Sequence, residues 1–133
     1  MEINYVAVLV ATVVNFAIGA LWYGPFFGKT WMRLQGFTHE SIKSMKMTPA
    51  RAMSLGFVST LVFTFVLAYL MGAIGISGVS EALALAVWIW LGFLVTTLAG
   101  SVLWENKSAT LFGFNIAYQL VSILITAAVL AVW

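Results

Sequence analysis

The side chains best placed to do chemistry form one polar stripe along the last apolar stretch of this chain. Asn115, Tyr118, Gln119, Ser122 and Thr126 recur at helical spacing, whereas the opposite side of the same stretch is uniformly Leu, Ile, Val and Ala. A side-chain amide that is buried away from water needs a hydrogen-bond partner. We therefore expect this stripe to face other protein or a wet cavity.

The other apolar stretches place polar side chains at a similar depth, about 10 to 15 Å from one end if every stretch is helical. The predicted polar layer consists of Asn15, Thr60, Thr96, Thr97, Asn115, Tyr118 and Gln119. One interpretation is that the layer holds helices together through interhelical hydrogen bonds of about 0.6 kcal/mol each. The alternative is a path or pocket for a small neutral or weakly polar solute. We favour the first, and we expect Asn15 to hydrogen-bond a residue of the last stretch.

Catalytic and metal-binding chemistry has little support in the composition. The chain has one His, His39, no Cys and no Asp, and its acids are Glu2, Glu40, Glu81 and Glu105. A metal site needs several ligands, and a catalytic site needs a nucleophile and a base within reach of each other. We therefore expect no enzyme, no cofactor and no metal site, and we interpret His39 as a solvated residue.

Membrane-spanning helices must position these polar side chains. The 133-residue chain is 63% hydrophobic and 8% charged, whereas about 25% of the residues in a soluble domain are charged. Four apolar runs, 3–23, 49–71, 81–103 and 109–132, are each long enough to cross a hydrocarbon core of about 30 Å. The first run lacks a preceding basic segment, so we interpret it as a span and not as a signal peptide. The sequence predicts an all-α membrane protein with a single integral membrane domain, 1–133.

Helix-breaking and capping residues separate the spans. Gly24-Pro25 ends the first span, because Pro cannot continue a helix. Thr48 followed by Pro49 is a typical start for the second span. Ser80 as a cap followed by Glu81 predicts the start of the third.

The segment 24–48 predicts a short amphipathic helix that lies in the membrane interface. Its apolar face consists of Phe27, Trp31 and Leu34, and its basic face of Lys29 and Arg33. Gly36 is expected to end this helix, and Thr38 to cap a further short turn. We expect anionic lipid headgroups as partners of the segment 24–51, and no nucleic acid.

The basic residues fix an orientation. The segment 24–51 holds Lys29, Arg33, Lys43, Lys46 and Arg51, and the 104–108 loop holds Lys107, which accounts for all 6 Lys and Arg residues. The positive-inside rule then places both basic segments in the cytoplasm and both termini outside. A bias this strong argues against antiparallel dual-topology dimers, so any homo-oligomer should be parallel.

Small residues recur at every fourth position of each span. The rows are Ala7, Ala11, Asn15 and Gly19; Ala52, Gly56, Thr60, Thr64, Ala68 and Gly72; Gly92, Thr96 and Gly100; and Ala109, Gly113 and Ala117. Such rows let helix backbones approach closely in lipid. They serve packing within one chain or an interface between chains, and we expect a homo-oligomer, with a membrane-protein partner as a further option.

Aromatic residues mark both predicted membrane surfaces. Trp22, Trp31 and Trp104 fall at the cytoplasmic surface, and Tyr5, Tyr69 and Trp133 at the outer one. Trp88 and Trp90 lie within the third span on nearly opposite faces. We expect one of them to contact lipid and the other to pack in the core.

The stretch Gly19-Ala20-Leu21-Trp22-Tyr23-Gly24-Pro25, followed by Phe27-Gly28-Lys29 and Trp31-Met32, resembles the signature of the domain-of-unknown-function 1761 family. The resemblance implies four membrane helices and a bacterial inner membrane, and it brings no established activity. In physical terms, Trp22 and Tyr23 anchor the interface and Gly24-Pro25 turns the chain. Lys29, Trp31 and Arg33 then seat the surface helix.

Two functions follow from these patterns. The first is a structural, accessory or lipid-contacting membrane protein that assembles as a parallel homo-oligomer. The alternative is a passive channel or transporter for a small neutral or weakly polar solute that uses Asn15, Asn115 and Gln119. Small multidrug transporters couple protons through a buried acid, and this zone offers only amides, so proton-coupled transport of cations is disfavoured.

Overall fold

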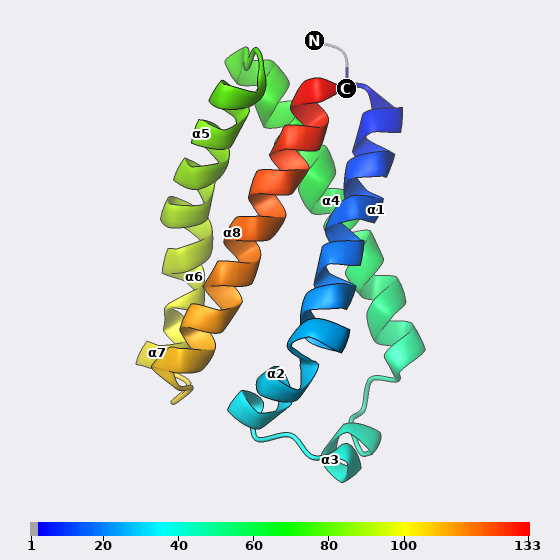
Figure 1. Cartoon of the computed structure of the whole chain (residues 1–133), viewed down its shortest axis with the longest axis vertical. Coiled ribbons are helices and arrows are strands. Elements are labelled where there is room, and N and C mark those ends of the chain that lie inside the picture. The colour runs from blue at the N-terminus through cyan, green and yellow to red at the C-terminus, as the bar shows by residue number, and fades with distance from the viewer. Residues whose placement is uncertain (1–2) are drawn as a thin grey trace.

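The computed structural model describes residues 3–133, and every regular element among them is a helix (Figure 1). Four helical spans are long and apolar enough to cross a membrane: Tyr5–Phe26, Pro49–Ile74, Val79–Leu103 and Ala109–Val132. The predicted all-helical fold with four spans is confirmed. Glu2 and the side chain of His39 lie outside the described residues.

The third span contains a π-helical turn, and the first span is kinked at Gly24, whose backbone (φ −109°, ψ −110°) is not helical. The first span is α1 (Tyr5–Leu21) followed by η1 (Trp22–Phe26), and the third is α5 (Val79–Ile89), η2 (Trp90–Val95), α6 (Thr96–Leu98) and α7 (Gly100–Leu103). The other spans are the single helices α4 (Pro49–Ile74) and α8 (Ala109–Val132), and the short helices α2 (Gly28–Gln35) and α3 (His39–Lys43) connect η1 to α4. The sequence patterns gave no indication of η2.

The helix ends follow the predicted capping chemistry at Thr38, Thr48 and Gly36 and depart from it at a fourth position. The Thr48 hydroxyl accepts the Arg51 backbone N–H at 3.2 Å, and Gly36 ends α2 with a left-handed backbone at φ 76°. The third span starts at Val79, so the prediction of Ser80 as its cap was wrong. The Glu81 carboxylate instead reaches back and accepts the Ser77 backbone N–H at 2.8 Å.

The helix α8 holds the centre of the bundle. It packs against α5 on one side and α1 on the other, and α4 packs mainly against α1 (Figure 1). The start of α1 and the end of α8 lie at one end of the bundle, called here the terminal end. The short helices α2 and α3, together with α7, lie at the opposite end, called here the α2 end (Figure 1).

The best-packed part of the molecule lies toward the terminal end. One buried cluster joins three spans and consists of Leu67, Met71, Ala82, Ala86, Ile123 and Ala127. Three of its six members are alanines with no exposed surface, so the backbones of α5 and α8 approach closely there. In lipid such close contact stabilises helix association through dispersion and not through the hydrophobic effect.

The small-residue rows are used differently from one span to the next. Ala7, Ala11 and Asn15 of the first row are buried inside this chain. Gly92 and Thr96 of the third row are exposed. The first row therefore serves packing within the chain.

The outer surface of the spans carries large apolar side chains, as lipid contact requires. Trp88 is 72% exposed, whereas Trp90 is partly buried and its indole N–H donates to the Ile116 carbonyl oxygen at 2.8 Å. The prediction that these two residues divide between the surface and the core is confirmed.

Candidate functional site

Asn15 forms the deepest polar contact in the bundle. Its amide nitrogen donates to the Thr126 hydroxyl at 3.0 Å, and its amide oxygen accepts from the Ser122 hydroxyl at 2.8 Å. Both partners belong to α8, so the predicted hydrogen bond from Asn15 to the fourth span is confirmed. All three side chains are buried, which makes this group a polar clamp between α1 and α8.

A second polar contact between the same spans lies nearer the α2 end. The Tyr23 hydroxyl donates to the Asn115 amide oxygen at 2.8 Å. Asn115 and Thr126 are separated by about 16 Å along α8 at 1.5 Å per residue. The predicted single layer is therefore drawn out along the bundle into two levels, with Tyr118 and Gln119 between them.

The threonines of the predicted layer do not gather around these amides. Thr96 and Thr97 are exposed, and the Thr96 hydroxyl donates to the Gly92 carbonyl oxygen of its own span at 2.7 Å. Thr60 likewise donates to its own helix, at the Gly56 carbonyl, but it lines the cavity described below. The structure thus brings Thr60 to the candidate site and leaves Thr96 and Thr97 outside it.

An aromatic cluster fills the α2 end between η1, α2 and α8. Tyr23 contacts Tyr118, Trp31 and Phe114 with ring centroids 5.0, 5.6 and 5.8 Å apart. Trp22 packs on Phe114 and Tyr118 in the same way. Trp22 and Trp31 were predicted to be surface anchors, yet both are half-buried in this cluster, while Trp104 is 87% exposed.

The turn between the first span and α2 positions the cluster. At η1 the Phe27 backbone N–H donates to the Trp22 carbonyl at 3.0 Å, a five-residue step that accommodates Pro25. A Cβ on Gly28 would lie 2.9 Å from the Tyr23 carbonyl oxygen. Only glycine allows α2 to fold back this tightly, which sets Trp31 against Tyr23.

The remaining residues of the predicted interfacial motif lie on the surface of this turn. Gly24 and Pro25 are exposed within η1, and Lys29 and Arg33 are exposed on α2. On the other side of α2, Trp31 and Leu34 are half-buried. On this short helix the two basic side chains are therefore more exposed than Trp31 and Leu34.

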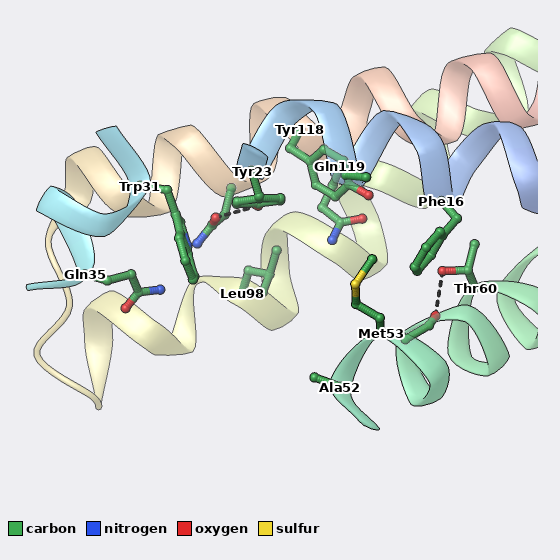
Figure 2. A pocket seen from close by; sticks show the side chains of 14 residues that line it. Phe16, Tyr23, Trp31, Gln35, Ala52, Met53, Thr60, Leu98, Tyr118 and Gln119 are labelled. Atoms are coloured by element: carbon green, nitrogen blue, oxygen red, sulfur yellow. Dashed lines mark hydrogen bonds between the residues drawn. The ribbon is translucent and has the colours of Figure 1, made fainter. Parts of the chain in front are cut away.

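A cavity of about 680 Å³, called here the cleft, opens beside the aromatic cluster (Figure 2). Its volume lies within the range of about 300 to 1,000 Å³ typical of small-molecule sites. Tyr23 and Trp31 line it near α2, Met53 and Thr60 contribute from α4, and Leu98 contributes from the third span. Figure 2 shows Gln119 between these walls, with no hydrogen bond from its amide to the other residues drawn.

A smaller cavity of about 220 Å³, called here the inner cavity, continues from the cleft toward the middle of the bundle. The two share Thr60, Tyr118 and Gln119 as lining residues. Asn15 and Ser122 of the polar clamp line the far side of the inner cavity. The polar side chains thus form a continuous wall from the α2 end to the clamp.

Among the described residues, neither cavity has a charged lining residue, and the cleft is lined mainly by apolar and aromatic residues with a few amides and hydroxyls. The hydrogen-bonding groups of both cavities are amides and hydroxyls, and no Asp, Glu, Lys, Arg or His is found among the described residues that line them. An ion would lack a countercharge in this environment, at a cost of several kcal/mol in hydrocarbon. The arrangement suits an uncharged molecule that both hydrogen-bonds and stacks.

Sequence reasoning found the amides of this site but not its walls. Phe16 and Met53 carry no polar signal, and Gly19 was assigned to a packing row and to the family motif but not to the site. A Cβ on Gly19 would lie 2.8 Å from the Tyr118 hydroxyl oxygen, so this glycine makes room for Tyr118 beside the cleft. The small-residue row was the one available signal of that contact.

Comparison with known proteins gives a family and no function. No curated protein and no solved structure matches the chain. The sequence profile of the family described as "Protein of unknown function (DUF1761)" matches residues 6–131, which include nearly all of the four spans and every residue that lines the cleft. The chain therefore belongs to the domain-of-unknown-function 1761 family.

Proposed function

We propose that this protein binds an uncharged, weakly polar molecule within the membrane, in the cleft at the α2 end. The observation that carries the proposal is the cleft itself, a cavity of about 680 Å³ whose amide and hydroxyl groups carry no charge. Binding is preferred to catalysis, because these residues contain no nucleophile beside a base.

The proposal includes an orientation. The six Lys and Arg side chains are exposed, and they belong to α2, α3, the connection from α3 to α4, the start of α4 and the loop after α7, all at the α2 end. We propose that this end faces the cytoplasm of a bacterial inner membrane, near anionic headgroups, and that both termini face outward. The cleft then lies in the cytoplasmic half of the bilayer.

A passive conduit is the second candidate, and the continuity between the cleft and the inner cavity favours it. Toward the terminal end, however, the buried cluster of Leu67, Met71 and Ile123 occupies the space between α4 and α8. A path across one chain would have to open that cluster. We also propose that the protein assembles as a parallel homo-oligomer. No contact within one chain requires this assembly.

The binding proposal is tested by filling the cleft. Met53 and Leu55 are neighbours on α4 with exposed fractions of 55% and 54%, but only Met53 lines the cleft. Saturable binding of the uncharged aromatic probe N-phenyl-1-naphthylamine should raise the unfolding temperature of the native protein in detergent. The rise should disappear in Met53→Trp and persist in Leu55→Trp.

The same variants separate binding from conduction. If the chain is a conduit, proteoliposomes should show flux of a small neutral solute, and Met53→Trp or Gln119→Leu should reduce it. The absence of flux, together with cleft-dependent probe binding, supports a binding protein. Equal probe binding by native protein and Met53→Trp would refute the proposal.

A further inference from the structure

The cleft is the first of three hollows that follow one another along α4. The second is the inner cavity, and the third is an apolar groove of about 270 Å³, called here the tail groove. Thr60 lines both the cleft and the inner cavity, and Phe63 lines both the inner cavity and the tail groove. From Ala52 to Leu70 the lining residues of α4 extend over about 27 Å.

The third span contributes one lining residue to each of the three hollows. Leu98 lines the cleft, Leu94 the inner cavity and Ile89 the tail groove. Ile89 and Leu94 are five residues apart, a spacing that falls on one face only across a π-helical turn. The unexpected η2 thus keeps one side of the span aligned with α4.

The chemical character of the lining residues changes from the cleft to the tail groove. The cleft combines aromatic rings with amides, the inner cavity is lined by Asn15, Ser59 and Ser122 among others, and the tail groove is lined only by Val62, Phe63, Val66, Leu67, Leu70 and Ile89. A molecule that filled all three hollows would therefore be polar at one end and hydrocarbon at the other.

The amide groups specify the polar end further. The Asn115 oxygen already accepts a hydrogen bond from Tyr23, so Asn115 presents its NH2 group to a ligand. Gln119 is not hydrogen-bonded to any other residue drawn in Figure 2 and offers a second NH2 group. Two amide donors without a cation favour an uncharged carbonyl oxygen over a phosphate or carboxylate.

We infer that the three hollows bind one uncharged, single-chain membrane lipid that carries a carbonyl-bearing head. The head lies in the cleft and inner cavity against Asn115 and Gln119, and the chain lies in the tail groove between α4 and the third span. We assign a single chain to the tail groove, because its volume of about 270 Å³ is less than half that of the cleft. This inference rests on the proposed function and names its ligand class.

Four probes added to the native protein in detergent test the ligand class. Decylubiquinone and monodecanoylglycerol share the uncharged carbonyl head and single chain, and the better of the two distinguishes a ring-headed lipid from an acylglycerol. Decyl phosphate has the chain with a charged head, and a dimethoxy-methyl-benzoquinone has the ring without the chain. We expect saturable stabilisation by at least one of the first pair and none by decyl phosphate.

The chain contributes dispersion contacts but little hydrophobic gain, since it leaves one hydrocarbon environment for another. We therefore expect the tail-less quinone to bind about tenfold more weakly than decylubiquinone. Equal binding of the two, or equal binding of decyl phosphate, would overturn the inference.

Groove-filling variants locate the chain. Val66 and Leu9 are 46% and 53% exposed, but Val66 lines the tail groove, whereas Leu9 lines a groove between α1 and α4 that shares only Val62 with it. Val66→Trp should remove the advantage of decylubiquinone over the tail-less quinone, and Leu9→Trp should retain it. The probes on the native chain decide the matter if Val66→Trp does not fold.

The outcomes separate this inference from the proposed function. If the tail-less quinone binds and Met53→Trp abolishes its binding, while chain length and Val66→Trp have no effect, the cleft is a binding site and the lipid assignment is wrong. If no probe binds, both fail. If Val66→Trp disrupts a dimer and leaves probe binding intact, a second copy of the chain covers the groove and the inference is overturned.

Discussion

The two ends of this bundle use the same kinds of residues to opposite effect. Toward the terminal end, Ala82, Ala86 and Ala127 are fully buried and let α5, α8 and α4 close around Leu67 and Met71. At the α2 end the small residues Ala20, Ala52 and Gly56 line an open cleft. Small residues therefore allow close approach but do not enforce it.

The difference comes from what stands between the helices. The helix α4 joins the buried cluster through Leu67 and Met71 near its end, whereas its first turns stand across the cleft from α8. At that end the rings of Trp22, Tyr23 and Phe114 occupy the space between η1, α2 and α8. These rings fill the space on one side of α8, whereas the space between α8 and the first turns of α4 stays open as the cleft.

The largest expected effect comes from making the same substitution at both ends. Ala86→Leu inserts a larger side chain where Ala86 has no exposed surface, and it should destabilise the protein by about 1 to 3 kcal/mol. Ala52→Leu places the same atoms beside the cleft, where Ala52 is exposed, and should change stability little. Unfolding midpoints in mixed micelles with increasing dodecyl sulfate measure both.

The same two variants test whether the two ends of the bundle differ in packing. If Ala52→Leu destabilises the protein as much as Ala86→Leu does, the α2 end is as tightly closed in solution as the terminal end. The probe-binding assay provides the second readout, because Ala52→Leu should weaken binding in the cleft while Ala86→Leu should not at temperatures where it remains folded.

A smaller effect should come from the tight contact between Gly19 and Tyr118 beside the cleft. In Gly19→Ala the new Cβ would lie 2.8 Å from the Tyr118 hydroxyl oxygen, so Tyr118 must shift, and we expect a loss of about 1 kcal/mol. Removing that oxygen in the double variant Gly19→Ala with Tyr118→Phe should restore most of the loss, because the next ring atom is 3.5 Å away.

Gly56→Ala is the matched control. Its Cβ would meet only Phe16, at 3.8 Å, which is an ordinary contact distance. A double-mutant cycle that found no coupling between positions 19 and 118 would show that the loss in Gly19→Ala arises from another contact. In that case the close approach of α1 to Tyr118 would not determine the position of Tyr118 in the wall of the cleft.

The fold was largely predictable, because each span is an apolar run of sufficient length and its ends carry recognisable caps. Thr48 and Gly36 behave as predicted for physical reasons that act locally. The start of the third span was misassigned because Ser80 and Gly78 are both plausible caps. The π-helical turn η2 packs against α8, and the residue pattern of one helix does not indicate such a contact.

Only the polar residues of the site were predictable from the sequence. Asn15 and Gln119 were identified because amides are costly in hydrocarbon. Helical spacing alone does not say that Tyr23 hydrogen-bonds Asn115, since that contact depends on the turn at Pro25. Trp31 was assigned to the membrane surface because sequence position indicates depth along a span but not which neighbours fold back over it.

The smallest expected effect concerns the Tyr23 hydroxyl, which links the aromatic cluster to the cleft. Tyr23→Phe removes its hydrogen bond to Asn115 and should cost about 0.6 kcal/mol, the average for such bonds in membranes. Because the Asn115 amide is then free to rotate, the variant should alter the affinity for uncharged probes more than it alters stability. Phe37→Leu is the control, since Phe37 packs on the far side of Trp31 at 5.4 Å and does not line the cleft. A Tyr23→Phe variant with unchanged probe affinity would mean that the cluster holds the α2 end in place without orienting the amide that faces the ligand.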